Sequence, residues 1–452
     1  MSNFRQVDRG TGFLLPPSVD EWLPERHLAR FVVEVIDQLD LSLLVKSYRG
    51  SGSASYHPSV LLGLLVYGYA TGVFSSRKLE RATYDSVAFR FIAANDHPDH
   101  DTIAAFRRRF LGEIETLFVG VLLLARETGM LQLGTVALDG TKLHANASRH
   151  SALSHGHASQ IEAQLKAEVA ELMALAEAAD KADVPDGMSV PEELERRKDR
   201  LALLAAANAK IEARAKERFE REQAEHEAKM QARADKEKAT GRKPGGKPPA
   251  PPTAGPEAKD QINLTDEDSR IMPVAGGGFE QAFNAQAAVA AGSMLVVTAD
   301  VVQAANDKQQ IVPTLEQLAR LPEALGTPET LLADSGYFSA ANVEACAQAG
   351  IAPLIAVHRE HHHLSWRERF AKPAPAPDDP TPLEAMRHRL TTPEGKQLYG
   401  LRKQTPEPVF GIIKSVMGFR QFSLRGLDKV KGEWNLVTMA WNIKRMFALA
   451  HP

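Results

Sequence analysis

The sequence predicts an α/β core with a mixed five-stranded sheet, preceded by an all-α N-terminal domain and interrupted by a helical insertion after the first core strand. Three patterns support this fold class. Apolar residues at helical spacing recur through the first part of the chain, and a stretch at 158–238 is rich in Ala, Glu, Lys and Arg. Short apolar runs that end at turn signals account for the strands.

The overall composition limits the classes of protein to which the chain can belong. Its 452 residues allow two or three domains, and a hydrophobic content of 44% supports real cores. A net charge of −3 argues against a uniformly basic nucleic-acid binder but leaves room for local basic patches. The single cysteine, Cys346, excludes an intrachain disulfide and a cysteine-based zinc site, and it fits a reducing cytoplasm. We expect neither a membrane span nor an N-terminal signal segment.

The first segment, 1–130, is expected to form the helical N-terminal domain. Its apolar spacing predicts four helices joined by short turns, with Val87 and Phe89 on the third. These helices are expected over 28–39, from Pro58, from Ser75 or Ser76, and from Asp101 or Thr102.

The triple Arg107-Arg108-Arg109 in this segment has two interpretations. It contacts DNA phosphates from a helix, or it is a solvated helix face that pairs with acids such as Glu113. Both stay open, because three adjacent arginines cannot all share one face. Arg107 and Arg108 are our candidates for DNA contact.

Two apolar runs each deliver an aspartate to the end of a strand. The run Val136–Leu138 leads to Asp139 within the segment 131–149, and Leu331–Ala333 leads to Asp334. A turn containing glycine follows each acid. Because sheet proteins tend to place their chemistry at strand ends, these carboxylates predict a shared metal site.

The segment 263–357 supplies the remaining core strands. A hairpin is expected at 283–300, followed by a helix over 307–320 and the strand that ends at Asp334. A helix near 340–349 and a strand at 351–357 complete the core. This order of elements matches a ribonuclease-H-like core that is interrupted after its first strand.

The interrupting segment, 150–262, reads as an insertion. Ser159 and Ser189 are each followed three residues later by Glu, as in capping boxes, and predict the starts of two long helices. The Pro- and Gly-rich stretch 243–252 predicts a disordered linker. The insertion is either a spacer or dimerisation hairpin, which we favour, or a clamp on DNA.

A second, polar insertion is expected at 358–398. Its four histidines are His358, His361, His362 and His363. Adjacent histidines on a loop seldom ligate one ion, so we do not assign a zinc site. Trp366 in the same segment either anchors it to the core or stacks on an unpaired base.

The last segment, 399–452, supplies a third acid. Thr405 suits a helix N-cap and Pro406 the first helical position, which puts Glu407 in the first turn. Lys414 lies two turns further along the same face. Between 396 and 450, ten Lys or Arg residues stand against three acids, and this excess predicts a polyanionic partner.

Asp139, Asp334 and Glu407 form a set of oxygen ligands that suits hard divalent cations, Mg²⁺ or Mn²⁺. Two such ions about 3.5–4 Å apart can activate a water or a DNA 3′-hydroxyl and stabilise the leaving oxygen of a phosphoryl transfer.

These segments together resemble the DDE transposases of bacterial insertion sequences, in the branch with a Tyr-Arg-Glu-Lys signature, as in insertion sequence family 1182. Nearly the whole chain takes part in the resemblance. The matching stretches are Tyr56–Phe110 in the N-terminal domain, Val136–Lys142 around the first acid, Phe283-Asn284-Ala285-Gln286, Ala333–Tyr337 around the second acid, and Tyr399, Arg402, Glu407 and Lys414. One departure is that four residues separate Arg402 from Glu407, whereas the family has three; Lys403 holds the family spacing.

The resemblance implies a ribonuclease-H-like fold in which Asp139, Asp334 and Glu407 hold the metal ions. Asp139 is expected to bridge both ions. The same resemblance implies phosphate contacts at the transposon end, through Tyr399, Lys414 and either Arg402 or Lys403. It implies that Trp366 stacks on a flipped base.

The implied partners are terminal inverted repeats, target DNA and further copies of the chain in a synaptic complex. The implied location is the bacterial cytoplasm, at the nucleoid when the protein is bound to DNA. Two alternatives stay open: a catalytically silent, transposase-derived DNA-binding protein, and a ribonuclease-H-type nuclease without transfer activity.

Overall fold

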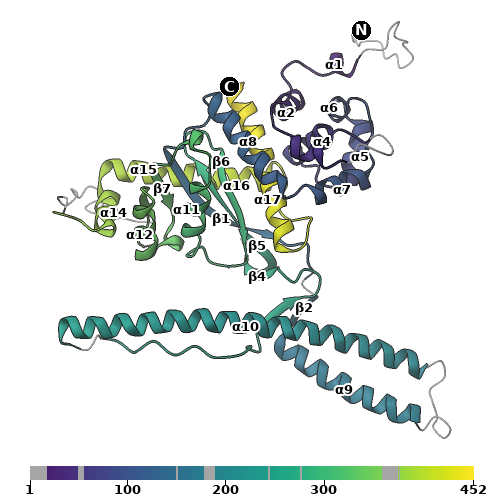
Figure 1. The fold of residues 1–452 in the computed structure, drawn as a ribbon, viewed down its shortest axis with the longest axis vertical. Coiled ribbons are helices and arrows are strands. Elements are labelled where there is room, and N and C mark those ends of the chain that lie inside the picture. Colours follow the sequence, from purple (N-terminus) through teal and green to yellow (C-terminus); the bar gives the residue numbers. More distant parts are fainter. Residues whose placement is uncertain are drawn as a thin grey trace, which may run out of the picture. The chain divides into compact units, whose positions relative to one another are not determined.

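The computed structural model describes residues 18–48, 55–148, 151–177, 189–242, 245–274, 277–358, 375 and 377–451. The chain divides into two compact units, whose elements are labelled in Figure 1. Unit 1 comprises Met1–Ala145, Met272–Gly278 and Ala282–Pro452, and unit 2 comprises Asn146–Ile271 and Phe279–Gln281.

The N-terminal part of unit 1 is helical, as predicted. Its helices are α1 (Val19–Trp22), α2 (Leu28–Asp37), α3 (Ser42–Lys46), α4 (Pro58–Thr71), α5 (Ser76–Asp85), α6 (Val87–Ile92), α7 (His100–Arg109) and α8 (Glu113–Glu127). Most side chains of α4 are buried, because α2 packs against it on one side and the C-terminal helix α17 (Leu427–Ala450) on another.

Two boundaries in this region differ from the prediction. The chain is extended at Ser86, so Val87 and Phe89 lie on α6 and not on the helix before it. The fourth predicted helix begins at His100, and its cap is Asp99, whose carboxylate accepts from the Thr102 N–H at 2.8 Å. Sequence spacing left several polar residues as candidate caps, and only the backbone geometry separates them.

The core of unit 1 is a mixed sheet of six strands. These are β1 (Thr135–His144), β4 (Arg270–Pro273), β5 (Phe279–Ala290), β6 (Val296–Val302), β7 (Thr330–Ala333) and β8 (Ala352–Ile355). β5 pairs with β1 and β6 in antiparallel fashion, whereas β7 is parallel to both β1 and β8. The mixed sheet is confirmed, and the prediction of five strands missed the short β4, which pairs with β5.

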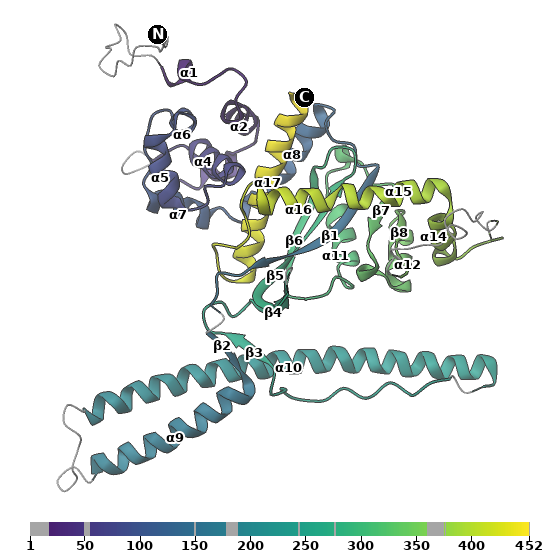
Figure 2. The ribbon, with the colours of Figure 1, turned by 180° about the vertical axis from the view of Figure 1, so that it is seen from behind.

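Helices pack on this sheet and complete the core. The other helical elements of unit 1 are α11 (Ile311–Ala319), η2 (Glu323–Leu325), η3 (Ser335–Tyr337), α12 (Ala340–Gln348), α14 (Pro382–Thr391), α15 (Pro393–Gln404) and α16 (Pro406–Ser415). Leu398, Tyr399 and Leu401 of α15 pack over a cluster formed by Ala137, Leu332 and Leu354 of three neighbouring strands. Figure 2 shows α15 leading into α16 beside these strands.

The C-terminal helix α17 is largely buried and packs against β6. Trp434 donates to the Gln286 carbonyl at 3.0 Å, and Asn442 bonds to both the N–H and the carbonyl of Val296 at 2.8 Å. Lys444 donates to the Ala70 carbonyl of α4. α17 therefore joins the sheet to the N-terminal helices.

A buried polar network reinforces that junction. Tyr69 of α4 donates to Glu433 of α17 at 2.8 Å, and Arg107 of α7 donates to the Tyr69 hydroxyl at 3.1 Å. Glu433 is 0% exposed, and its other oxygen accepts the backbone N–H groups of Ser423 and Leu424. Arg107 is thus buried inside unit 1, which corrects its assignment as a DNA contact; Arg108 is exposed.

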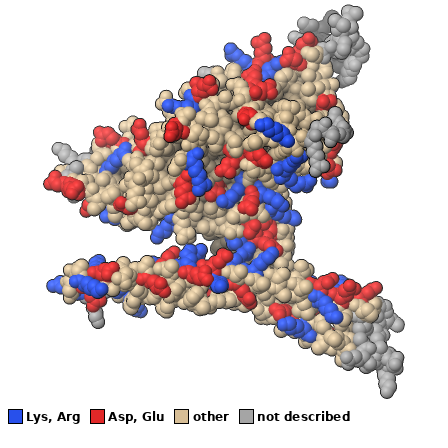
Figure 3. All heavy atoms as spheres, in the orientation of Figure 1, with Lys and Arg blue, Asp and Glu red and all other residues tan. Residues whose placement is uncertain are grey.

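Unit 2 is a helical hairpin with a small ribbon at its base. It contains β2 (Ala152–Ser154), α9 (His155–Glu177), α10 (Val190–Thr240) and β3 (Gln261–Asn263), with β2 antiparallel to β3. Glu162 bonds to Asn208, and Glu168 to Arg197, so the two helices run in opposite directions. On the face shown in Figure 3, Lys and Arg side chains are interspersed with Asp and Glu along α10.

Two predictions for this region were wrong. α9 begins at His155, directly after β2, and the Ser159 hydroxyl donates to the His155 carbonyl instead of capping the helix. The Pro-rich stretch, where described, is bonded along α10: Arg233 donates to the carbonyl of Gly246, and His226 bonds to that of Pro249. An extended chain rises about twice as far per residue as a helix, so this short stretch matches a longer length of α10.

The polar segment predicted at 358–398 is partly helical, since α14 and the start of α15 lie in it. Trp366 and the histidines His361, His362 and His363 lie outside the described residues. Within the described ranges no single helix is long and apolar enough to cross a membrane. One pair, α4 with α5, meets length and composition criteria together and is bent by 96°.

The buried network generates a first prediction. Arg107→Met should lower the free energy of unfolding by about 2–4 kcal/mol, because it removes the buried cation that is linked to the Glu433 carboxylate through the Tyr69 hydroxyl. Arg108→Met, at the adjacent exposed position, should change it by less than about 0.5 kcal/mol. Urea unfolding followed by circular dichroism measures both, and equal stabilities for the two variants would contradict the structural role of Arg107.

Candidate active site

Parallel pairing of β1 with β7 sets the position of the first two acids. Ala137 lies opposite Leu332, and the same register continued by two residues sets Asp139 opposite Asp334, which follows the end of β7. Neighbouring strands lie about 4.8 Å apart, so the two acids lie side by side where β7 ends. β1 itself continues to His144, so the expectation that Asp139 lies at the end of its strand was wrong.

Asp139 is held in an environment that disfavours its charge. Burial raises its pKa to about 6, with further repulsion from Asp334 and Asp307. Two interactions oppose the rise: the Gly140 N–H donates to Asp139 Oδ1 at 2.9 Å, and Arg402 attracts the carboxylate. The carboxylate therefore gains from any cation brought beside it.

Asp334 caps the 3₁₀ turn η3, where it accepts the Gly336 N–H at 2.8 Å. The turn places Tyr337 in the interior. Burial, followed by the charges of Asp307 and the other two aspartates, raises the pKa of Tyr337 well above its usual range. Tyr337 therefore stays protonated and donates to Gln286 Oε1 at 2.6 Å.

Glu407 lies in the first turn of α16 with a side chain that is 53% exposed. Thr405 and Pro406 occupy the predicted cap and first helical positions. The Thr405 hydroxyl, however, donates to the Leu401 carbonyl and does not cap α16. Pro406, which has no N–H to satisfy, starts the new helix at this point.

Arg402 is the cation nearest these acids. Its side chain is 12% exposed, and its Nη2 lies 3.5 Å from Glu407 Oε1. Burial lowers the pKa of Arg402, but attraction from Tyr399 and from Asp139, Asp334 and Glu407 outweighs burial, so the pKa is raised on balance. Lys403, the alternative at the family spacing, is exposed on α15.

Asp307 is an acid of this site that the sequence analysis did not single out. Its Oδ1 accepts hydrogen bonds from Asn284 and Gln286 of β5, each at 2.7 Å, and lies 3.7 Å from Lys142 Nζ. The sequence placed it at the start of a helix, but α11 begins only at Ile311. Asp307 does not directly follow β6, which ends at Val302, so the signal of an apolar run leading into an acid did not pick it out.

Gly140 makes room for this network. A Cβ at this position would lie 2.2 Å from Gln286 Nε2, 2.7 Å from Asp307 Oδ1 and 2.9 Å from Asn284 Oδ1. In the antiparallel register Gly140 lies opposite Gln286. Any side chain here would therefore separate the three polar groups that meet behind Asp139.

Two lysines flank the acids. Lys414 of α16 donates to Thr141 Oγ1 and, at 2.9 Å, to the Lys142 carbonyl, which ties α16 to β1. Burial lowers the pKa of Lys142, against the attraction of Asp307. Burial also lowers the pKa of Lys414, with repulsion from Lys142 and Arg420.

The excess of Lys and Arg between 396 and 450 is weaker evidence for a polyanionic partner than we expected from the sequence. Several of its cations bond inside unit 1: Lys414 to β1, Arg420 to the Lys414 carbonyl, Lys431 to Asp300, Lys444 to Ala70 and Arg445 to Ser293. Counting charges along the chain cannot separate these from cations left for a partner.

The donor chemistry of the site fits a hard divalent cation. Carboxylates converge on it, one with a raised pKa, and the buried Oδ1 of Asn284 has no hydrogen-bond partner within the described chain. Among the described residues, no three His, Cys, Asp or Glu side chains already stand in a metal-binding arrangement. Glu407 is the most exposed of the three predicted ligands, and Arg402 contacts it.

Two stretches of the chain match known family models. Residues 17–109 match the family model described as Transposase domain (DUF772), and residues 259–443 match Transposase DDE domain. The chain carries the domains of a DDE transposase. The DDE match implies a ribonuclease-H-like fold and includes Asp334 and Glu407, whereas Asp139 lies between the two matched stretches. No curated protein and no solved structure matched the chain.

The glycine at position 140 generates a second prediction. Gly140→Ala should cost about 1–3 kcal/mol of stability and reduce activity, because the methyl group displaces Gln286 and Asp307. Gly134→Ala, just before the same strand, meets no atom within 4 Å and serves as the control. Thermal unfolding compares the two, and a Gly140→Ala protein as stable as the control would contradict the packing described here.

A third prediction concerns pH. The Asp139 pKa is raised in the folded state from 3.8 to about 6, so the protonated form stabilises the fold, and this contribution is lost as pH rises through that window. In metal-free buffer, Asp139→Asn should melt a few degrees above wild type at pH 7.5 and at a similar temperature near pH 4.

The exposed Asp199→Asn provides the control for this comparison and should follow wild type at both pH values. Differential scanning calorimetry in the presence of a chelator measures the difference. A variant that melts below wild type at pH 7.5 would show that the buried charge is not destabilising.

Proposed function

We propose that this transposase binds the terminal inverted repeats of its element and catalyses metal-dependent DNA strand cleavage and strand transfer. Asp139, Asp334 and Glu407 are proposed as the metal ligands. The observation that supports the proposal is the parallel pairing of β1 with β7, whose register, continued past the end of β7, aligns Asp139 with Asp334. Asp334 and Glu407 lie inside the matched DDE domain. Glu407 contacts the same arginine that faces both aspartates.

The three carboxylates would hold two Mg²⁺ or Mn²⁺ ions, and Asp139 is proposed to be the ligand whose loss is least tolerated. When bound, the metal supplies activation of the attacking hydroxyl and neutralises charge on the phosphate. Asp307 and its partners Asn284 and Gln286 position β1 behind Asp139 and do not themselves contact DNA in this proposal.

Arg402 is proposed to have one role in the free protein and another when DNA is bound. Beside the acids it offsets their mutual repulsion, and its guanidinium offers a bidentate donor to a DNA phosphate. Its buried position beside the acids favours it over Lys403 for the arginine role of the signature. Tyr399, Lys403, Lys414 and Arg108 are kept as further candidate DNA contacts, and Trp366 as a candidate base-stacking residue.

We further propose that the active form is a homo-oligomer that joins two transposon ends and captures target DNA. Each copy would contribute its own acids, because all three proposed ligands lie within unit 1.

The fourth prediction tests the acids. Asp139→Asn, Asp334→Asn and Glu407→Gln should each reduce Mg²⁺-dependent cleavage of terminal-repeat DNA by at least about 10³-fold, since each removes a proposed metal ligand. Binding of the same DNA should change by less than about threefold. Cleavage is followed on labelled duplexes by denaturing gel electrophoresis.

Glu394→Gln is a matched control, because Glu394 and Glu407 each directly follow a proline at the start of a helix. Full activity in any of the three test variants removes that residue from the triad. Cleavage by the wild type without joining of precleaved ends would indicate a nuclease, and no nicking with Mn²⁺ would indicate a silent DNA-binding protein.

A further inference from the structure

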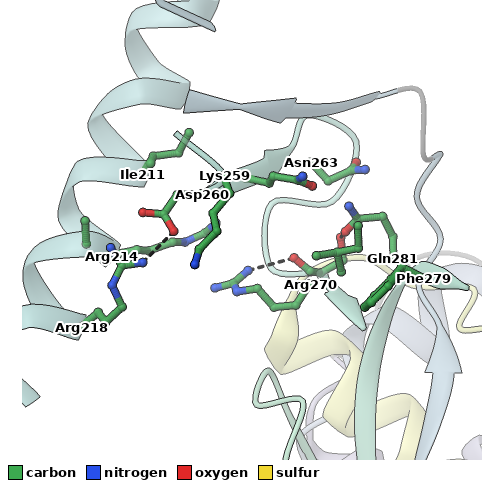
Figure 4. A pocket seen from close by; sticks show the side chains of 13 residues that line it. Ile211, Arg214, Arg218, Lys259, Asp260, Asn263, Arg270, Phe279 and Gln281 are labelled. Carbon is green, nitrogen blue, oxygen red and sulfur yellow. Dashed lines mark hydrogen bonds and ion pairs between the residues drawn. The ribbon is translucent and has the colours of Figure 1, made fainter. Parts of the chain in front are cut away.

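Unit 2 contains a cavity of about 540 Å³ that the proposed chemistry does not use. It lies between α10, β3 and the first residues of β4 and β5, all within unit 2 (Figure 4). We call it the unit-2 pocket. In Figure 4, Arg214 and Arg218 reach toward it from α10, and Arg270 reaches from the opposite wall.

The lining of the unit-2 pocket is predominantly basic. Arg214, Arg218, Lys259 and Arg270 stand against one carboxylate, Asp260. Asp260 is already neutralised by Arg218, whose Nη1 lies 2.6 Å away. Two nearby acids outside the pocket also have cations of their own, since Glu257 pairs with Lys259 and Glu267 with Lys210.

Arg214 and Arg270 form no ion pair with a carboxylate among the described residues, although Asp266, Asp268 and Glu217 attract Arg270 from a greater distance. Arg214 donates to the Glu267 carbonyl, and Arg270 donates to the carbonyls of Glu267, Asp268 and Ser269. Carbonyl groups satisfy donors without cancelling a full charge. Arg214 Nη1 is buried and has no hydrogen-bond partner among the described residues. The pocket therefore keeps an unused donor beside two guanidinium groups.

The pKa of Arg270 also indicates that the unit-2 pocket favours an anion. Burial lowers the pKa of Arg270 to about 10, and repulsion from Arg214 adds to the shift, while the charges of Asp268, Asp266 and Glu217 offset part of it. An anion between the two guanidinium groups would relieve this repulsion.

Apolar side chains at the rim of the unit-2 pocket add a second feature. Phe279 is 59% exposed and Ile271 is 47% exposed, and both line the pocket with Arg270. Exposed apolar groups beside unpaired cations suit a ligand that has an apolar part next to its phosphate, as a nucleotide of DNA does.

We propose that the unit-2 pocket binds a phosphodiester group of DNA, with Arg214 and Arg270 bonding to the phosphate and Phe279 packing on the adjoining deoxyribose. The choice of DNA rests on the proposed function. The helical insertion then acts as a DNA-contacting element, in place of the spacer or dimerisation hairpin expected from the sequence. Phosphate and sugar contacts of this kind position DNA without reading its sequence.

The test uses the full chain and a fluorescein-labelled 20-base-pair duplex that carries the element's terminal repeat. Arg214→Gln/Arg270→Gln should raise the Kd measured by fluorescence anisotropy by about tenfold or more and reduce its salt dependence, because phosphate contacts are lost. Phe279→Ala, at an exposed position that should not disturb folding, should raise the Kd about threefold.

Arg200→Gln/Arg221→Gln is the matched control: it removes the same charge from exposed positions on α10 outside the pocket. It should alter the Kd by less than about twofold. Equal effects of the two double variants would overturn the proposal, because the Kd would then depend on the overall charge of the protein and not on the unit-2 pocket. An unchanged Kd for Phe279→Ala together with an unchanged Kd for Arg214→Gln/Arg270→Gln would overturn it as well.

Two further readouts separate the possible failures. The first readout is the melting temperature in 10 mM inorganic phosphate. If phosphate raises it for the wild type but not for Arg214→Gln/Arg270→Gln, and the two proteins have the same Kd for DNA, the unit-2 pocket binds a free anion. The assignment to DNA is then overturned. If the wild type neither binds nor cleaves the duplex, the proposed function itself fails. Intact cleavage with unchanged binding in the pocket variant overturns only the present inference.

Discussion

Parallel pairing between β1 and β7 is the constraint on which the candidate site depends. It aligns two acids that are 195 residues apart in the chain, and it forms the apolar surface of Ala137 and Leu332 on which α15 packs. α15 in turn carries Arg402 toward the acids and delivers the chain to Glu407. Slippage of this register by one residue would turn one acid to the other face of the sheet.

The grouping of acids works against the stability of the fold. Burial and repulsion raise the pKa of Asp139, and the structure compensates with the neighbouring Arg402 and with Lys142 beside Asp307. α17 supplies stability elsewhere, through hydrogen bonds to β5, β6 and α4. Such a division, with strain at the site and rigidity around it, is typical of enzymes whose sites are less stable than their scaffolds.

The sequence predicted those features of the fold that depend on residues close together in the chain. The apolar runs before Asp139 and Asp334 predicted the existence of both strands, and Thr405-Pro406 marked the start of α16. The end of the first strand was wrong, because pairing with β5 extends β1 to His144. Prediction from the sequence failed where the outcome depends on distant partners. Asp307 looked like the start of a helix because its partners on β5 lie more than twenty residues away, and Arg107 looked exposed because its partner Tyr69 lies on another helix. The basic unit-2 pocket also combines residues from separate segments.

The ribbon at the base of unit 2 has a consequence for assembly of the catalytic sheet. β1 and β5 must pair although well over a hundred residues separate them, and closing so long a loop costs conformational entropy. Once β2 and β3 pair, the insertion enters and leaves through adjacent strands, so the effective loop is only the short stretches on either side. Local folding of the insertion would thus lower the effective contact order of the sheet and speed its formation.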